Sequence, residues 1–168
     1  TEWKILDAKT IEFKLRPGVK FHNGDEFDAK DVTFSFSPER TGQDEKSSAV
    51  VLSKPFLGGI DKIETIDPLT VRISMREPDA LLVQRFANYP SQILSKKGFD
   101  EAGTMEAYAK HPIGTGPYAL AGFDLGESVV LKAFDQHWNT TKAAADKVTF
   151  TVVPEGSTRI AGLLSGQF

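Results

Sequence analysis

The segment Thr10–Arg16 alternates between polar and apolar side chains at every position. Ile11, Phe13 and Leu15 fall on one side of an extended chain, and each is followed by a charged residue. Because successive side chains of a strand point to opposite faces, this period of two predicts a strand with one buried face. Part of the core is therefore expected to lie on one face of a sheet.

A helix start follows this strand after a loop with two glycine turns. Asp28 is a favourable N-cap residue, and Asp31 stands three positions later, as in a capping box. Phe27 and Val32 occupy the two positions of a hydrophobic staple. These signals predict a helix that begins at Asp28 and ends near Pro38.

A second alternating segment, Thr70–Met75, follows Ile60–Ile66 and the turn signal Asp67-Pro68. The two segments are predicted to pair as an antiparallel hairpin. The remaining patterns complete an α/β mixture. We expect helices from Pro78 to Tyr89-Pro90, around Thr104–Lys110 and over Ser157–Gln167 with Ser157 as N-cap and Gly166 near the C-terminal end, strands over Tyr118–Phe123, Ser128–Phe134 and Lys147–Val153, and an exposed loop over Thr41–Ser48.

The pattern changes at Pro112–Tyr118, where mixed short elements give way to longer strands around a glycine-rich turn. We interpret this segment as a junction between two substructures. Residues 20–105 are then expected to make few side-chain contacts with residues 125–165, compared with the contacts inside each set.

Composition restricts the class of protein. With 168 residues, 40% of them hydrophobic and 26% charged, the chain can bury one sizeable core or two small ones. The net charge of -3 argues against a nucleic-acid partner, and no apolar run of about 18 residues exists to span a bilayer. The absence of cysteine excludes disulfides and thiolate zinc sites. No secretion signal opens the chain, so any signal is expected outside these residues.

Two motifs have both a functional and a structural interpretation. Gly114–Ala119 fits the G-x-G-x-x-G/A dinucleotide fingerprint, but that motif needs a helix after it, and a strand pattern follows here. A tight entry into a strand is the preferred interpretation. A turn followed by a helix cap explains, without a metal, the polar cluster of His22, Asn23, Asp25, Glu26, Asp28 and Asp31. No cofactor is expected.

The segment Arg85–Ser91 is the candidate ligand site. A helix end followed by a proline offers backbone and side-chain donors beside an aromatic ring, a combination that suits small-molecule sites. The candidate residues are Arg85, Asn88, Tyr89 and Ser91. An ordinary helix C-terminus is the competing and simpler interpretation. No nucleophile with a base and no G-x-S-x-G elbow is found, so an enzyme is not expected.

The aromatic residues divide between core and open positions. Large aromatic side chains most often bury in cores, although they also line ligand pockets. Phe13, Phe34, Phe36 and Phe150 are expected in the core, whereas Trp3 and Trp138 remain open to either role.

Short segments spread over nearly the whole chain carry a resemblance as an ordered set. They are Trp3, Thr10–Arg16, Val19–Gly24, Ala29–Ser35, Gly114–Tyr118, Trp138, Val148–Phe150, Val153-Pro154, Thr158-Arg159 and Leu163–Gly166. In this order they resemble family 5 of the extracellular solute-binding proteins, which capture oligopeptides, dipeptides or nickel for ABC importers. Each segment alone is ordinary fold punctuation, and the order gives the specificity.

The resemblance implies a two-lobed periplasmic-binding-protein-like fold of type II, cluster C, with a mixed sheet and flanking helices. Residues 1–112 would form most of the small subdomain of lobe I, and residues 113–168 would form strands and a helix of its main part. The second lobe, which in peptide-binding members holds the ligand's termini, would be absent from this chain. Arg85–Ser91 would face the cleft between the lobes.

The resemblance also implies a function without covalent chemistry. The protein would capture a peptide by hinge closure and deliver it to a membrane permease, with a nickel complex or another small solute as the alternative ligand. It would be periplasmic, or extracellular and lipid-anchored. An interaction or sensory domain without a transport ligand is the alternative function.

Overall fold

The computed structural model describes residues 2–41, 46, 48–140 and 143–167. The chain forms two compact units. The first consists of Thr1–Thr115 and Gln136–Trp138, and the second of Gly116–Asp135 and Asn139–Phe168. The boundary after Thr115 falls inside the segment expected as a junction. The return of Gln136–Trp138 to the first unit was not anticipated by the sequence pattern.

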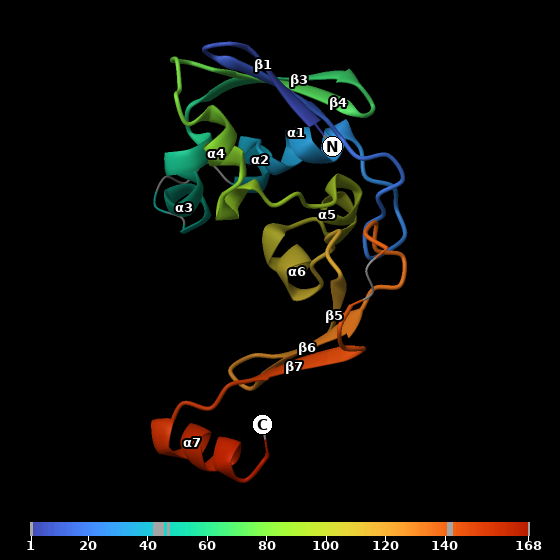
Figure 1. Cartoon of the computed structure of the whole chain (residues 1–168), viewed down its shortest axis with the longest axis vertical. Helices are drawn as coiled ribbons and strands as arrows, with labels where there is room; N and C mark the ends of the chain where they lie inside the picture. Colours follow the sequence, from blue (N-terminus) through green and yellow to red (C-terminus); the bar gives the residue numbers. More distant parts are fainter. Residues whose placement is uncertain (1, 42–45, 47, 141–142, 168) are drawn as a thin grey trace. The chain divides into compact units, whose positions relative to one another are not determined.

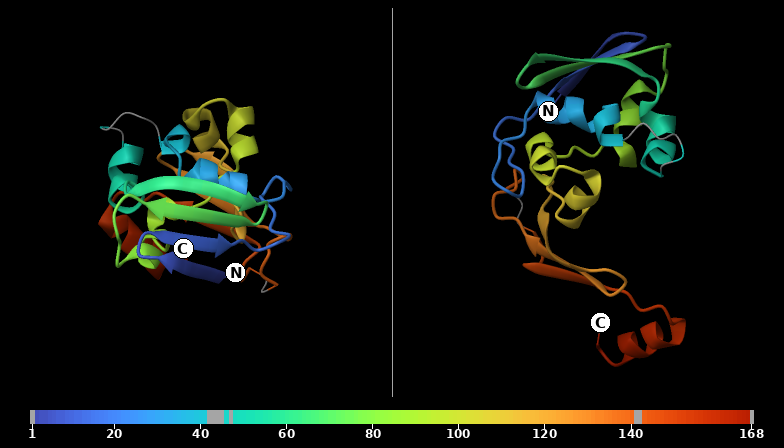
Figure 2. Two further views of the ribbon diagram at one scale, coloured as in Figure 1. Left: turned by 90° about the horizontal axis from the view of Figure 1, so that it is seen from above. Right: turned by 180° about the vertical axis from the view of Figure 1, so that it is seen from behind.

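The first unit is built on a four-stranded antiparallel sheet (Figures 1 and 2). The predicted hairpin around Asp67-Pro68 is confirmed, and so is the strand predicted over Thr10–Arg16, which ends at Lys14. The first strand was not predicted, because it is an edge strand whose six residues are all exposed and which therefore has no burial pattern. In spatial order the strands are β1 (Glu2–Asp7), β2 (Thr10–Lys14), β4 (Thr70–Met75) and β3 (Ile60–Asp67).

The core lies between one face of this sheet and two helices, α1 (Ala29–Ser35) and α4 (Leu82–Phe86), which Figure 1 shows on the same side. Ile11, Val71 and Ile73 are fully buried on that face. The buried apolar side chains form two clusters. Val32 of α1 belongs to one of them, and Leu82 of α4 belongs to the other. Of the aromatic residues expected in the core, Phe34 is buried, and Phe13 and Phe36 pack partly buried against these clusters.

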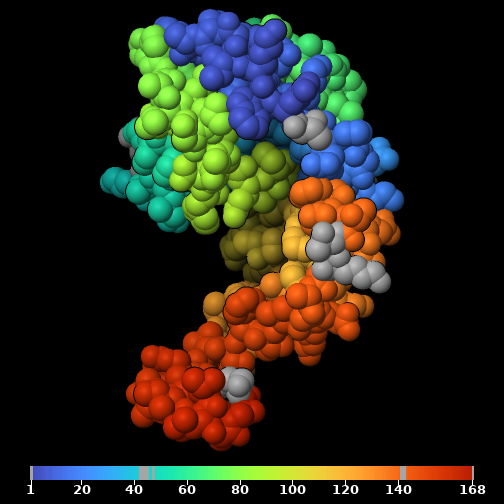
Figure 3. Space-filling view, viewed as in Figure 1, coloured from blue at the N-terminus to red at the C-terminus, as the bar shows by residue number. Residues whose placement is uncertain are grey.

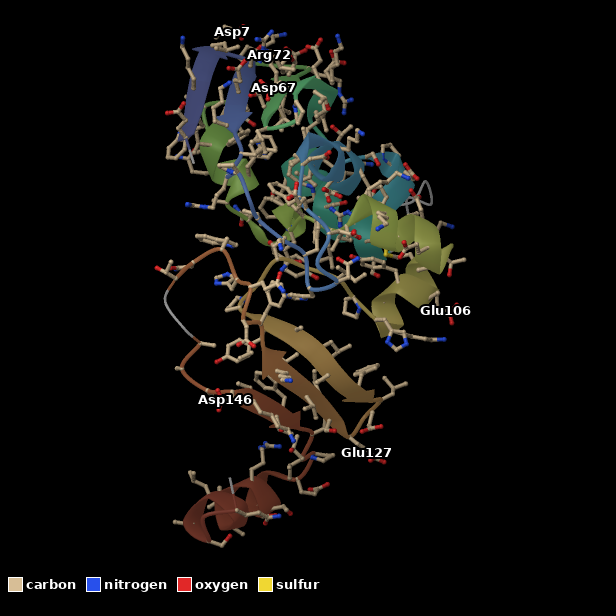
Figure 4. All side chains as sticks on the ribbon, turned by 90° about the vertical axis from the view of Figure 1, so that its right-hand side faces the viewer. Asp7, Asp67, Arg72, Glu106, Glu127 and Asp146 are labelled. Atoms are coloured by element: carbon tan, nitrogen blue, oxygen red, sulfur yellow. The ribbon has the colours of Figure 1, made fainter. Side chains whose placement is uncertain are left out.

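The other face of the sheet is charged. Arg72 of β4 donates to the Glu12 carboxylate of β2 at 2.8 Å. On its other neighbouring strand, β3, Arg72 is in register with Glu64. Lys4 of β1 is in register with Glu12, so charge alternates in sign across all four strands. Figure 4 shows Asp67 and Arg72 on the side of the sheet away from the helices. This face balances its own charges and suits contact with water.

The predicted cap of α1 is confirmed in full. The Asp28 carboxylate accepts from the Lys30 amide at 2.6 Å, and the Asp31 carboxylate accepts from the Asp28 amide at 2.9 Å, which completes a capping box. The helix ends at Ser35, and a separate turn, α2 (Pro38–Thr41), follows it.

The remaining helices of the first unit agree only in part with the sequence pattern. The helix expected from Pro78 begins at Leu82 instead, because the Asp79 side chain accepts from the Leu81 amide and makes a turn there. The loop expected over Thr41–Ser48 falls largely outside the described residues. The helix at Thr104 is confirmed as α6 (Met105–Lys110), whereas three elements were not predicted. These are α3 (Ser48–Leu57), α5 (Lys96–Ala102) and the short 3₁₀ helix η1 (Tyr89–Ser91).

The second unit is a three-stranded antiparallel sheet followed by a helix. The three predicted strands are confirmed, and every pairing among the described residues of both sheets is antiparallel, where a mixed sheet was expected. None of the helices in the described residues is long and apolar enough to cross a membrane. The elements are β5 (Tyr118–Asp124), β6 (Ser128–Ala133), β7 (Lys147–Thr151) and α7 (Gly156–Leu164).

Two expectations for the second unit are wrong. Phe150 was expected in a core but is 58% exposed, because it lies on β7, an edge strand of a small sheet. Ser157 was expected to cap α7, but the N-cap residue lies two residues earlier, at Glu155, and the helix starts at Gly156. Gly166 has a φ of 73° just beyond the helix, as a glycine at this C-terminal position allows.

Candidate functional site

The candidate segment Arg85–Ser91 joins the end of α4 to the short 3₁₀ helix η1. It belongs entirely to the first unit. The part of the chain that contains it, light green in Figure 3, lies at the surface near β1, which is dark blue. The structure therefore brings the four predicted residues together on one surface turn, where their side chains have different roles.

Arg85 is engaged in structural contacts. Its guanidinium forms an ion pair with Asp79, and its Nη1 donates to the Pro55 carbonyl oxygen of α3 at 2.6 Å. The hydrogen bond from Arg85 lowers the pKa of the Asp79 carboxyl. Arg85 therefore connects the end of α4 to the preceding turn and to α3, rather than presenting its charge to solvent.

Asn88 and Ser91 also bond within the segment. The Asn88 amide nitrogen Nδ2 donates to the Gln84 carbonyl oxygen at 2.8 Å, which satisfies a carbonyl at the end of α4. The Ser91 hydroxyl donates to the Arg85 carbonyl oxygen at 3.3 Å, and the Ser91 amide donates to the Asn88 carbonyl oxygen at 3.0 Å. These bonds make the turn a defined structure.

Tyr89 is the member of the set that points outward. Its side chain is 68% exposed, and its hydroxyl makes no hydrogen bond to the described residues. A tyrosine combines a large apolar ring with a polar hydroxyl, so an exposed tyrosine suits contact with a ligand. The turn therefore offers one exposed aromatic side chain on a base fixed by the other three.

A cavity of about 410 Å³ opens beside this turn and shares Phe86 and Ser91 with it. Its apolar wall is an aromatic cluster in which the Phe86 ring lies 5.4 Å from Phe13 and 5.7 Å from Phe36 between centroids. Trp3 of β1, which is 59% exposed, forms part of its lining. No local pattern predicts this cavity, because its lining comes from segments that are distant in the sequence.

The two ambiguous motifs have structural roles in this chain. Gly114 pairs with His22 through two bonds, one to its carbonyl oxygen at 2.9 Å and one from its amide to His22 Nδ1 at 3.3 Å. A strand begins at Tyr118, as the strand-entry interpretation predicts, so the helix that a dinucleotide site needs is missing there. Asp25 binds Lys97 at 2.7 Å, and the described residues contain no group of acidic and histidine side chains suited to a metal.

Solved structures with the same fold are substrate-binding proteins of ABC transporters. DppA from Helicobacter pylori, a periplasmic binding protein in complex with the peptide STSA, matches 99% of this chain and 36% of its own with a TM-score of 0.87 and 30% identity. NikA from Brucella suis, in complex with Fe(III)-EDTA, matches 99% of this chain and 32% of its own with a TM-score of 0.80 and 28% identity. The fold class is thereby confirmed.

The chain belongs to family 5 of the bacterial extracellular solute-binding proteins, whose middle region matches residues 1–168. The dipeptide-binding protein of Escherichia coli K12 is 33% identical over 96% of this chain and 33% of its own length. The glutathione-binding protein GsiB of Pectobacterium atrosepticum is 30% identical over 96% of this chain and 30% of its own. The chain thus spans about a third of the length of these relatives. The family consists of binding proteins and not of enzymes.

Proposed function

We propose that the protein carrying this chain is the solute-binding component of an ABC importer and that its solute is a peptide. The family match over all 168 residues carries the proposal. The names of similar proteins support the solute class, since they include a dipeptide-binding and a glutathione-binding protein and a receptor solved with a peptide. A metal complex is the competing ligand, as the structure of NikA illustrates.

The mechanism is ligand-stabilised closure of two lobes. In such a receptor the solute contacts both lobes, so it binds the closed state more tightly than the open state and shifts the population toward closure. Residues 1–112 form most of the small subdomain of lobe I in this proposal, and residues 113–168 belong to its main part. The second lobe lies outside this chain. The protein works outside the cytoplasm, with its signal or lipid anchor outside these residues, and delivers the solute to a membrane permease.

The turn Arg85–Ser91 faces the solute in this proposal, and Tyr89 makes the contact. Arg85, Asn88 and Ser91 hold the turn, because their polar groups already bond to neighbouring residues. Tyr89→Ala in the full-length protein should weaken peptide binding at least about tenfold while changing the melting temperature little, since the side chain is exposed. Equal affinity with a lowered melting temperature would assign Tyr89 a purely structural role.

Native mass spectrometry of the full-length protein identifies the ligand class directly. We expect a co-purified peptide, and we expect X-ray scattering to show compaction when a dipeptide such as Ala-Phe is added. Glutathione and nickel-histidine serve as competing probes. A protein that neither carries nor binds any of these solutes, and does not compact, would favour an interaction or sensory domain instead.

A further inference from the structure

Arg40 of α2 reaches the candidate turn from the other side. Its Nε donates to the Ser35 carbonyl oxygen at 2.7 Å, and its Nη2 donates to the Pro90 carbonyl oxygen at 2.9 Å. Pro90 is the residue after Tyr89 and the middle residue of η1. One planar guanidinium therefore joins the C-terminal end of α1 to the centre of the turn.

The charged guanidinium of Arg40 bonds to backbone carbonyl oxygens. Among the described residues it makes no ion pair with a carboxylate, and burial lowers the pKa of its half-buried guanidinium. Buried charges are costly unless they are hydrogen-bonded or paired. The carbonyl groups at the end of α1 supply partial negative charge, because a helix dipole has its negative end there. The arginine is thus suited to bridging two backbone oxygens.

A second contact fixes the chain just beyond the turn. Ser35, which is fully buried, accepts a hydrogen bond from the Leu94 amide at its Oγ at 2.8 Å. Together with Arg85 at the start of the turn, Arg40 and Ser35 hold the segment on both sides of Tyr89. The exposed tyrosine is therefore carried by a backbone that is fixed before any ligand arrives.

We propose that Arg40 is a positioning residue of the solute site, which holds the Asn88–Ser91 turn in place so that Tyr89 is presented to the solute from a fixed backbone. The inference rests on the proposed function, because it takes Tyr89 to contact the solute. A turn whose backbone is already fixed loses little conformational freedom on binding, which increases affinity. Lysine cannot replace arginine fully, since a single ammonium group does not reproduce the planar fork that bonds two carbonyls at once.

Hydrogen exchange on this chain tests the positioning role without any ligand. In Arg40→Gln the amides of Ser91 and Leu94 should exchange about tenfold faster or more, because a charged hydrogen-bond donor to the turn is lost. Amides of β2 and β4 should keep their protection. Arg40→Lys should give an intermediate effect and provides a second variant if the glutamine form folds poorly.

Arg76→Gln is the matched control, since Arg76 also donates to two backbone carbonyls, those of Gly58 and Ile60, at another place in the unit. This variant should leave the exchange of Ser91 and Leu94 unchanged. Equal exchange at these amides in the Arg40→Gln and Arg76→Gln variants would overturn the inference. So would an increase in Arg40→Gln that is uniform over the sheet, because that pattern reports global destabilisation.

A double-mutant cycle in the full-length protein links Arg40 to binding. Tyr89→Ala and Arg40→Gln should each weaken binding of Ala-Phe, and the double variant should bind no more weakly than Tyr89→Ala alone. Additive effects would show that Arg40 does not act through Tyr89. If Tyr89→Ala leaves binding unchanged, the assignment of Tyr89 to the solute fails, while the exchange experiment still decides whether Arg40 fixes the turn.

Discussion

The pKa values of Asp79 and Asp31 are shifted in opposite directions. The hydrogen bond from Arg85 and the bond from the Leu81 amide lower the pKa of Asp79 below its usual value of 3.8. Burial raises the pKa of Asp31, although the amides of Asp28 and Lys96 donate to its carboxylate. The stabilisation from Asp79 is therefore present above pH 3.8 and is lost as pH falls through its lowered pKa, whereas that from Asp31 declines as pH rises from 3.8 through its raised pKa.

The directions of these two pKa shifts predict how the stability of the first unit changes at acid pH. The free energy of unfolding should fall when the pH is lowered from about 7 to about 3, and it should fall less in Asp79→Asn, which lacks the carboxylate paired with Arg85. Asp31→Asn should show a larger fall than the native chain. Urea unfolding at the two pH values measures all three. If the free energy of unfolding falls as much in Asp79→Asn as in the native chain, the stabilising role of the Asp79 carboxylate is wrong.

For the four candidate site residues, the local structure could be predicted from the sequence but their contacts could not. A helix end before Tyr89-Pro90 could be predicted from the proline, because the residue before a proline disfavours helix. The sequence gives no sign that Arg85 pairs with Asp79 and Pro55, or that Arg40 bonds to Pro90. Those contacts depend on tertiary structure that brings α2, α3 and α4 together.

The two central strands of the first sheet were predictable because each has one buried and one charged face. β2 and β4 alternate visibly because both lie in the middle of the sheet and have a helix-covered face. β1 is exposed along its length, and α5 has no apolar period. Gly98 within α5 lies where an added Cβ would be 2.7 Å from Ile113 Cδ1, so this helix depends on close tertiary packing that local pattern does not reveal.

Because β4 lies in the middle of the sheet, substitutions of its buried side chains should destabilise the first unit most. Ile73→Ala should lower the free energy of unfolding by about 2–5 kcal/mol, because the side chain is fully buried and its removal leaves a cavity. Ile66→Ala on β3, where the side chain is 47% exposed, should change it by about 0.5 kcal/mol or less. Urea titration compares the two. Equal effects would contradict the assignment of the core to this face.

At the scale of the whole molecule, the second unit exposes much of its apolar surface. Phe123, Leu125 and Phe150 in the sheet segment are between 47% and 87% exposed, and Leu163 and Leu164 of α7 are 69% and 84% exposed. Large exposed apolar patches mark surfaces that pack against something else. The relatives are about three times as long as this chain, which is consistent with further parts of the fold covering these residues.

The isolated chain should therefore self-associate weakly through the second unit. Sedimentation velocity over a range of concentrations should show a rising mean mass, and Leu164→Glu should reduce it by placing a charge on the exposed apolar face. Gln167→Glu introduces the same charge just beyond α7 and should have little effect. A monomer at every concentration, or equal effects of the two variants, would contradict this expectation.

We propose that solute is captured between two lobes, of which this chain supplies only a part. Small-molecule sites bury about 70–90% of the ligand surface, and in the proposed two-lobed receptor part of that burial comes from surfaces outside these residues. Titration calorimetry with Ala-Phe should therefore detect binding to the full-length protein and weak or no binding to this 168-residue chain. Comparable affinity in the two would show that the site lies within these residues and that capture between two lobes is wrong.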